Sequence, residues 1–144
     1  MSMFYTVTTL RKLKILAAEV GIEDNIIWLG ATDNVHDYLR LADMYCHTSR
    51  SEGFGRAIVE AMTHKLPVVA TNVGGVSEII SNKEVGLLAP SEDVTEIANN
   101  LQKLIENRQL RLKIGIAAYE HVLKNFSIEN QAQKLIKKYQ LLMK

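Results

Sequence analysis

Residues Ser51–Ala61 read SEGFGRAIVEA, and this stretch decides how the rest of the chain is interpreted. Two glycines flank a phenylalanine, two glutamates lie eight positions apart, and an apolar, helix-forming segment follows at once. A helix that begins near Gly55 or Arg56 presents free backbone N–H groups and the positive end of its dipole. Glycines before such a helix let the phosphate of a ligand approach the backbone closely. The stretch therefore predicts a diphosphate site where the loop meets the helix.

The two glutamates suit the two ends of a nucleotide sugar. Glu60 would lie about one turn inside the helix, where its carboxylate can accept hydrogen bonds from two neighbouring ribose hydroxyls. Glu52 lies in the loop on the far side of the phosphate position and can accept hydrogen bonds from a sugar. Because two carboxylates repel a diphosphate, a cationic side chain is needed, and Arg50 and Arg56 are the nearest. The alternative is a tight turn followed by a solvated Glu60, and the residues alone leave it open.

Short apolar segments alternate with helical segments on both sides of this stretch. Strands are expected at Ile26–Leu29, Met44–His47, Leu66–Ala70 and Gly86–Ala89. Helices are expected over residues 10–20, 35–41 and 57–63, and Gly74–Gly75 form a turn into Val76–Ile80. This alternation indicates an α/β fold, a Rossmann-like parallel sheet with helices on both faces. Ligands of such sheets bind beyond the carboxyl ends of the strands, so the loops after Leu29, His47 and Ala70 are the candidate site.

The C-terminal part of the chain is predicted to be helical from about residue 93 to residue 144. Asp93 with Glu96 three positions later is a helix-start signature, because each side chain can accept from a free backbone N–H. Two further helices are expected, near Gln109–Lys124 and Ile128–Met143. With 144 residues and no internal linker, residues 1–144 are predicted to form one domain.

Composition excludes several classes of protein. The net charge of +1 argues against nucleic acid or an anionic membrane as the main partner. The single cysteine, Cys46, excludes an internal disulfide and is expected to be a small buried side chain in a reducing compartment. No apolar stretch approaches the ~20 residues needed to span a bilayer, and the first residues lack the pattern of a secretory signal. A cytoplasmic protein is expected, with peripheral membrane contact possible.

Other catalytic constellations are weak. The four histidines are scattered without the spacing of metal ligands, so no metal site is predicted. His47 lies at a strand end that faces the expected cleft. The sequence GVSEI at Gly75–Ile79 is not the nucleophile elbow of hydrolases, which needs glycine two places on either side of the serine.

The segment Ser49–Ile80, SRSEGFGRAIVEAMTHKLPVVATNVGGVSEII, resembles the C-terminal, donor-binding half of retaining GT-B glycosyltransferases of glycosyltransferase family 4 (glycosyl transferases group 1). Glu52 and Glu60 match the glutamate–seven–glutamate motif of that family. The resemblance extends upstream through EVGIEDNIIWLGATDNVHDYLRLADMY and downstream through VGLLAPSEDVTEIANNLQKL, so it covers nearly the whole chain. The combination of glutamates, GFG, PVVAT and GGVSE is far more specific than a glycine motif alone.

The resemblance implies roles for particular residues. Glu52 is the implied catalytic residue and, with Gly53, Phe54 and Gly55, contacts the transferred sugar. The implied diphosphate ligands are the backbone amides of Arg56, Ala57 and Ile58, the ribose ligand is Glu60, and the base lies near Leu29 and Gly30. The family implies a UDP- or GDP-sugar as substrate, retention of anomeric configuration, no cofactor and no metal. Bacterial polysaccharide or lipid-linked glycan assembly, with membrane association through the acceptor pathway, fits the breadth of the family.

The chain departs from the family pattern at its N-terminus. It starts after the strand and loop whose arginine and lysine neutralise the diphosphate, so the sheet is expected to lack its first strands. Met3–Thr9, MFYTVTT, is expected to stand where the second strand would be, without the glycine-rich loop that normally follows. The N-terminal acceptor-binding domain of the family is expected to be missing as well. The isolated chain is therefore expected to transfer little or no sugar, and either its N-terminal segment or a second copy is expected to cover the free edge of the sheet.

Three other functions remain as alternatives. A non-catalytic nucleotide-sugar-binding or scaffolding module is favoured by the missing basic loop and the missing partner domain. A sugar-nucleotide epimerase shares the architecture but not the GFG context of Glu52. A plain dinucleotide-binding domain is disfavoured because no early strand leads into G-x-G-x-x-G.

Overall fold

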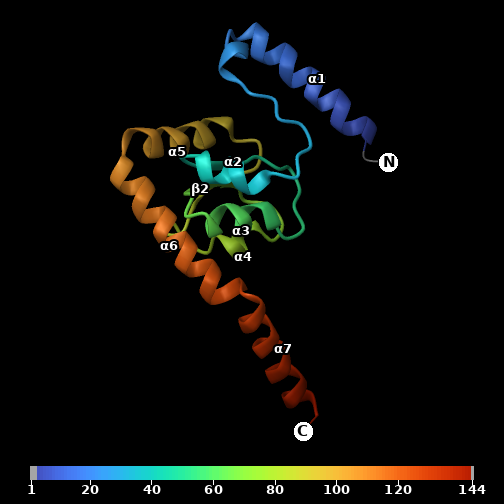
Figure 1. The fold of residues 1–144 in the computed structure, drawn as a ribbon, viewed down its shortest axis with the longest axis vertical. Helices are drawn as coiled ribbons and strands as arrows, with labels where there is room; N and C mark the ends of the chain where they lie inside the picture. Colours follow the sequence, from blue (N-terminus) through green and yellow to red (C-terminus); the bar gives the residue numbers. More distant parts are fainter. Residues whose placement is uncertain (1–2, 144) are drawn as a thin grey trace. The chain divides into compact units, whose positions relative to one another are not determined.

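The computed structural model describes the backbone of residues 3–143 and the side chains of residues 9–133 and 135–143. The described chain forms two separate units, Met1–Asp33 and Asn34–Lys144. Its elements follow in the order α1 (Met3–Glu19), the 3-10 turn η1 (Glu23–Asn25), α2 (Val35–Leu41), β1 (Tyr45–His47), α3 (Arg56–Thr63), β2 (Val68–Thr71), α4 (Val76–Ile79), β3 (Leu87–Ala89), α5 (Val94–Glu106), α6 (Arg108–Phe126) and α7 (Ile128–Leu142) (Figure 1). No helix in this described part has the length and apolar character needed to cross a lipid bilayer.

The first unit consists of α1, η1 and the segment that follows them. The prediction that Met3–Thr9 is a strand is wrong, because these residues form the first part of α1. The apolar positions from Leu10 to Ala17 continue the same helix, and Ala17 is buried. Gly21 ends it with φ +70°, a conformation that other residues rarely adopt, as expected of a helix stop. These residues thus continue the helix of the residues that follow them and do not form the strand expected from the family pattern.

The strand predicted at Ile26–Leu29 is also wrong. Ile26 has extended backbone angles, φ −111° and ψ 125°, but residues 26–29 pair with no strand among the described residues. An extended apolar segment becomes a strand only when a neighbour satisfies its backbone N–H and C=O groups. Local sequence can favour the extended conformation, but it cannot supply that neighbour.

The second unit is built on a parallel sheet, as predicted, and its three strands lie in the order β1-β2-β3. Cys46 of β1 lies opposite Val69 of β2, and Ala70 of β2 lies opposite Leu88 of β3. All residues of the central strand β2 are buried. Strand β1 is an edge strand, and Cys46 is exposed, so the prediction of a buried cysteine is wrong. The reason is its position: a side chain on an edge strand is covered on fewer sides than one on β2.

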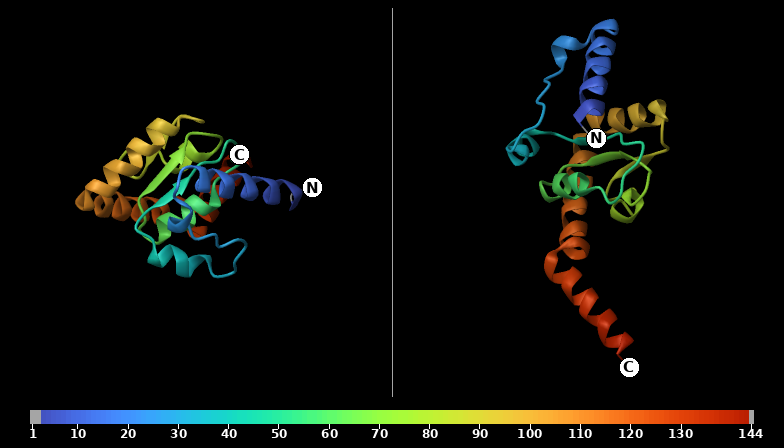
Figure 2. Two further views of the ribbon diagram at one scale, coloured as in Figure 1. Left: turned by 90° about the horizontal axis from the view of Figure 1, so that it is seen from above. Right: turned by 90° about the vertical axis from the view of Figure 1, so that its right-hand side faces the viewer.

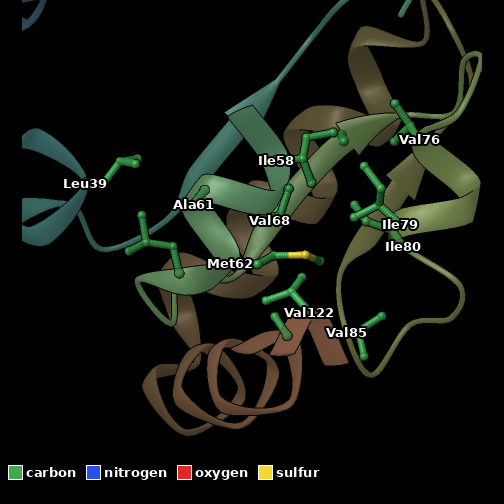
Figure 3. Close-up of a cluster of buried hydrophobic side chains, with 13 residues drawn as sticks. Leu39, Ile58, Ala61, Met62, Val68, Val76, Ile79, Ile80, Val85 and Val122 are labelled. Carbon is green, nitrogen blue, oxygen red and sulfur yellow. The ribbon is translucent and has the colours of Figure 1, made fainter. Parts of the chain in front are cut away.

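Helices cover both faces of this sheet, as Figure 2 shows. Val68 and Ala70 point into a core formed with α3, α4 and the second half of α6, and Val69 points to the other face, against Leu104 of α5 and Ile114 of α6. Neighbouring strand residues face opposite sides, so β2 contributes to both cores. Figure 3 shows the larger core, which contains Leu39, Ile58, Ala61, Met62, Leu66, Val68, Ala70, Val76, Ile79, Ile80, Val85, Ala118 and Val122.

The helices predicted after Asp93 are present, and each begins with a side-chain cap. The Asp93 carboxylate accepts from the amide of Glu96 at 2.9 Å. Asn107 accepts from Leu110 at 2.9 Å before α6, and Ser127 accepts from the third residue after it before α7. Such caps are each worth about 1 kcal/mol because they satisfy N–H groups that the helix leaves free.

Along the free edge of the sheet, the N-terminal segment contributes no strand, since it is helical. The N-terminal segment therefore does not fill the gap as a strand. Pairing with a second copy, and the single domain predicted for residues 1–144, stay predictions.

Candidate functional site

The loop that follows β1 is held in place by the turn that follows β2. The amide of Gly75 donates to the carbonyl oxygen of Gly53 at 3.2 Å. Gly74 has φ +51°, and a Cβ there would overlap the carbonyl oxygen of Glu52, while a Cβ on Gly75 would lie 2.6 Å from that of Gly53. Only glycine allows this close approach of two backbones. Two of the three loops predicted to form the site therefore meet, and the third, after Leu29, belongs to the other unit.

Thr71, the last residue of β2, fixes the start of the same loop. Its side chain is buried, and its hydroxyl donates to the carbonyl oxygen of Ser49 at 2.5 Å. The carbonyl oxygen of His47 is a second acceptor, 3.4 Å from the same hydroxyl. A buried hydroxyl that bridges two strands in this way sets the direction in which the chain leaves β1.

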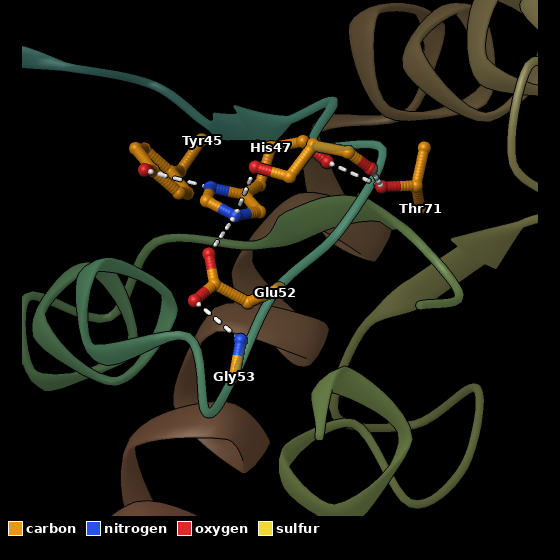
Figure 4. Close-up of polar contacts among 6 residues, drawn as sticks. Tyr45, His47, Glu52, Gly53 and Thr71 are labelled. Carbon is orange, nitrogen blue, oxygen red and sulfur yellow. Dashed lines mark hydrogen bonds and ion pairs between the residues drawn. The ribbon is translucent and has the colours of Figure 1, made fainter. Parts of the chain in front are cut away.

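Glu52 is held at both carboxylate oxygens, as Figure 4 shows. Its Oε1 accepts from the amide of Gly53 at 3.1 Å, and its Oε2 lies 3.0 Å from Nε2 of His47. The Glu52 side chain is 26% exposed, so the carboxylate is partly shielded and still open to a ligand. The hydrogen bonds leave further lone pairs on both oxygens, which a sugar hydroxyl can use.

Helix α3 begins at this loop with an open N-terminus. Gly55 caps it in the left-handed conformation, φ 93° and ψ 47°. The amide of Ile58 donates to the carbonyl of Gly55 at 2.9 Å, whereas the amides of Arg56 and Ala57 have no acceptor among the described residues. Two N–H groups at the positive end of the helix dipole are therefore available to an anion.

Phe54 anchors the loop to the C-terminal helices. Its ring lies 5.7 Å from that of Phe126, the last residue of α6, at an angle of 58°. Tilted aromatic pairs of this kind are worth about 0.5–1.5 kcal/mol beyond the area they bury. The remaining 42% of Phe54 is exposed and available to a ligand.

Glu60 lies on α3, one turn after the free amides. Its Oε1 lies 3.7 Å from the exposed guanidinium of Arg56. Burial, followed by the charges of Glu60, Cys46 and Glu52, raises the pKa of the Tyr45 hydroxyl above its ordinary value. Both glutamates therefore lie within electrostatic reach of one tyrosine hydroxyl on β1, on the side of the sheet where α3 packs.

The two arginines that could neutralise a diphosphate, Arg50 and Arg56, are both exposed. Arg50 pairs with Glu92 at 3.1 Å, and both side chains are largely exposed. Arg56, 87% exposed, can turn toward a ligand without leaving a buried charge. No group of three or more His, Cys, Asp or Glu side chains that could hold a metal ion occurs among the described residues.

Three residues at this site were missed or underrated by the sequence analysis: Tyr45, His47 and Thr71. Residues two apart on a strand share a face, so placing Tyr45 and His47 toward α3 required the register of β1. Thr71 could have been noticed, because it ends a buried strand whose following loop was already a candidate.

Comparison with known proteins gives a consistent result. Residues 7–121 match the family model described as Glycosyl transferases group 1. The chain is 31% identical over 125 residues to the N-acetyl-alpha-D-glucosaminyl L-malate synthase of Bacillus anthracis, covering 87% of this chain and 32% of that protein. It is 31% identical over 135 residues to the lipopolysaccharide core biosynthesis mannosyltransferase LpsB of Rhizobium meliloti, covering 92% of this chain and 38% of that protein. The chain thus spans about a third of the length of these relatives.

Solved structures show the same fold. The structure of Anabaena Alr3699/HepE in complex with UDP matches 96% of this chain and 38% of its own, with a TM-score of 0.88 and 27% identity. The C-terminal domain of a glycosyl transferase group 1 family protein (LpcC) from Francisella tularensis matches 84% of this chain and 64% of its own, with a TM-score of 0.75 and 29% identity. The predicted α/β Rossmann-like architecture, the C-terminal half of a GT-B fold, is confirmed.

Proposed function

Because the chain belongs to the glycosyl transferases group 1 family, we propose that it is the donor-binding half of a retaining glycosyltransferase. In this proposal it binds a nucleoside-diphosphate sugar whose sugar passes to an acceptor. The observation that carries the proposal is the junction between the loop after β1 and α3. There Glu52 and Glu60 lie on either side of two free amides at a helix N-terminus.

The diphosphate is assigned to the start of α3. The free amides of Arg56 and Ala57 donate to phosphate oxygens, with Ile58 completing the first turn. The Arg56 guanidinium supplies the positive charge that two nearby carboxylates make necessary. No metal is required in this arrangement. Glu60 accepts hydrogen bonds from the two ribose hydroxyls.

The sugar is assigned to the loop before α3. Glu52, with the backbone of Gly53 and Gly55 and the open part of the Phe54 ring, contacts the sugar that is transferred. Glu52 is the catalytic residue of the proposal, since a carboxylate beside the reacting carbon favours the positive charge that develops there.

The substrate is a UDP- or GDP-sugar in this proposal. The Anabaena neighbour was solved with UDP, with UDP and glucose, and with UDP-glucose, which supports a nucleotide sugar. Leu29 and Gly30, to which the family resemblance assigns the base, belong to the other unit, so this proposal is built on the second unit alone. The name of LpsB, a lipopolysaccharide core biosynthesis mannosyltransferase, supports a role in polysaccharide or lipopolysaccharide assembly. In this proposal the chain works in the cytoplasm, beside the membrane that carries the acceptor.

A thermal-shift panel tests this proposal. The chain is mixed with UDP, GDP and ADP and with UDP-glucose and GDP-mannose. A ligand at a hundred times its dissociation constant is expected to add about 2.7 kcal/mol to the free energy of unfolding. One nucleotide series is expected to raise the melting temperature, which identifies the base. No shift with any of these compounds would contradict the proposal.

Turnover by the isolated chain is expected to be negligible. The 144-residue polypeptide spans about a third of the length of its relatives, and in this proposal a separate acceptor-binding half orients the second substrate. An acceptor-binding domain, or a second copy of this chain, is the partner of the proposal. Robust acceptor-dependent release of nucleoside diphosphate by this chain alone would contradict it.

The second candidate is a non-catalytic nucleotide-sugar-binding or scaffolding module, which would use the same free amides at the start of α3. Adding the separate acceptor-binding half of a relative discriminates between the two. Restored transfer supports the enzyme, and binding without transfer supports the module.

A further inference from the structure

The geometry points to His47 as the residue that positions the Glu52 carboxylate for the sugar of the nucleotide sugar. This inference rests on the proposed function, because it gives Glu52 the sugar-binding role described above. His47 does not touch the ligand in this account. It acts through Glu52 and is therefore a positioning residue.

The first step of the argument is that the imidazole of His47 is itself held. Tyr45 and His47 lie two apart on β1 and share the face toward α3. Their rings are stacked at 6.0 Å with an angle of 28°, and the His47 side chain is only 14% exposed. A ring fixed in this way can define the position of a group bonded to it.

Hydrogen-bond chemistry then assigns the proton on His47. Nε2 lies 3.0 Å from Oε2 of Glu52, and an ionised carboxylate only accepts hydrogen bonds. Nε2 must therefore carry a hydrogen and donate it. In the neutral ring Nδ1 is then the acceptor, and the Tyr45 hydroxyl lies 3.3 Å from it. The Ser49 hydroxyl, 3.0 Å from Nε2, can share this N–H as a second acceptor.

The consequence is a carboxylate with a defined orientation. His47 holds one oxygen of Glu52 and the amide of Gly53 holds the other at 3.1 Å. The remaining lone pairs of both oxygens are left for hydroxyl groups of the sugar. A group whose rotamer is fixed before the ligand arrives loses less freedom on binding, so the affinity for the sugar rises.

Calorimetric titration of two variants, His47→Leu and His47→Gln, tests this inference. Each variant is titrated with UDP and UDP-glucose, and with GDP and GDP-mannose. The measured quantity is the ratio of the affinity for the nucleotide sugar to that for the bare nucleotide. Loss of a hydrogen bond to a charged group is expected to lower this ratio about tenfold in His47→Leu, with the bare nucleotide unchanged. His47→Gln retains an N–H donor near the position of Nε2 and is expected to restore most of the ratio. His36→Leu, an exposed histidine on α2, is the matched control.

Nitrogen NMR of the unliganded chain measures which ring nitrogen of His47 carries the hydrogen. A purely structural role of His47 would not require a particular tautomer. The ring of His47 is expected to show the Nε2–H tautomer, and this does not depend on whether His47→Leu folds. An Nδ1–H tautomer, or an unchanged ratio in a folded His47→Leu variant, would overturn the inference while nucleotide binding still supports the proposed function. Failure of the unmutated chain to bind any of the four compounds would overturn both.

Discussion

Replacing Glu60 by alanine is expected to abolish the stabilisation that a nucleoside-diphosphate sugar gives to the chain. The carboxylate is assigned two hydrogen bonds to ribose hydroxyls, and hydrogen bonds to charged groups are worth about 1.5–3 kcal/mol each. Their loss lowers affinity by roughly a hundredfold or more. At a ligand concentration that stabilises the unmutated chain by about 2.7 kcal/mol, the variant should show almost no shift in melting temperature.

The unliganded Glu60→Ala variant is expected to fold normally. The Glu60 side chain is 37% exposed, and its ion pair with Arg56 at 3.7 Å is of the surface type, worth about 0–1 kcal/mol. Alanine is also the strongest helix former. Glu120→Ala, an exposed glutamate on α6, is the matched control and should keep the full ligand shift. A Glu60→Ala variant that binds UDP or GDP as tightly as the unmutated chain would contradict the ribose assignment.

The second large effect is expected for Gly74→Ala. A Cβ at this position overlaps the carbonyl oxygen of Glu52, and φ +51° is unfavourable for any residue with a side chain. Backbone strain and overpacking each cost about 1–3 kcal/mol, so the free energy of unfolding should fall by about 3 kcal/mol. Relief of the overlap must move the loop that carries Glu52. Affinity for the nucleotide sugar is therefore expected to fall even where the variant stays folded.

Urea denaturation of Gly74→Ala beside Gly53→Ala checks this prediction. Gly53 lies in the loop that Gly74 contacts, but a Cβ there meets no atom within 4 Å. Gly53→Ala should unfold within about 0.5 kcal/mol of the unmutated chain, as surface substitutions usually do. Equal unfolding midpoints for both variants would show that the two loops do not meet as described.

Much of the second unit could be predicted from sequence because its signals are local. Strands near Tyr45, Val68 and Leu87 are short apolar segments between turn residues, and the Asp93 cap is a three-residue pattern. The site's position followed from the rule that ligands bind beyond the carboxyl ends of parallel strands. The contact between the turn after β2 and the loop after β1 agrees with that rule.

The errors fall where the conformation depends on distant partners. Residues 26–29 would have needed a neighbouring strand to become a strand themselves. Met3–Thr9 was predicted as a strand from the family pattern, although the residues that follow it have a helical pattern. The burial of Cys46 depended on the strand order, which places β1 at an edge. The hydrogen bonds around His47 depended on the register of β1 and the path of the loop after it, which no local pattern encodes.

A crystal structure of the chain with UDP-glucose, or with the nucleotide sugar that gives the largest thermal shift, tests the central claim most directly. The account predicts the diphosphate on the amides of Arg56 and Ala57, the ribose on Glu60 and the sugar beside Glu52. A ligand bound away from the start of α3, or a ribose that does not contact Glu60, would contradict it.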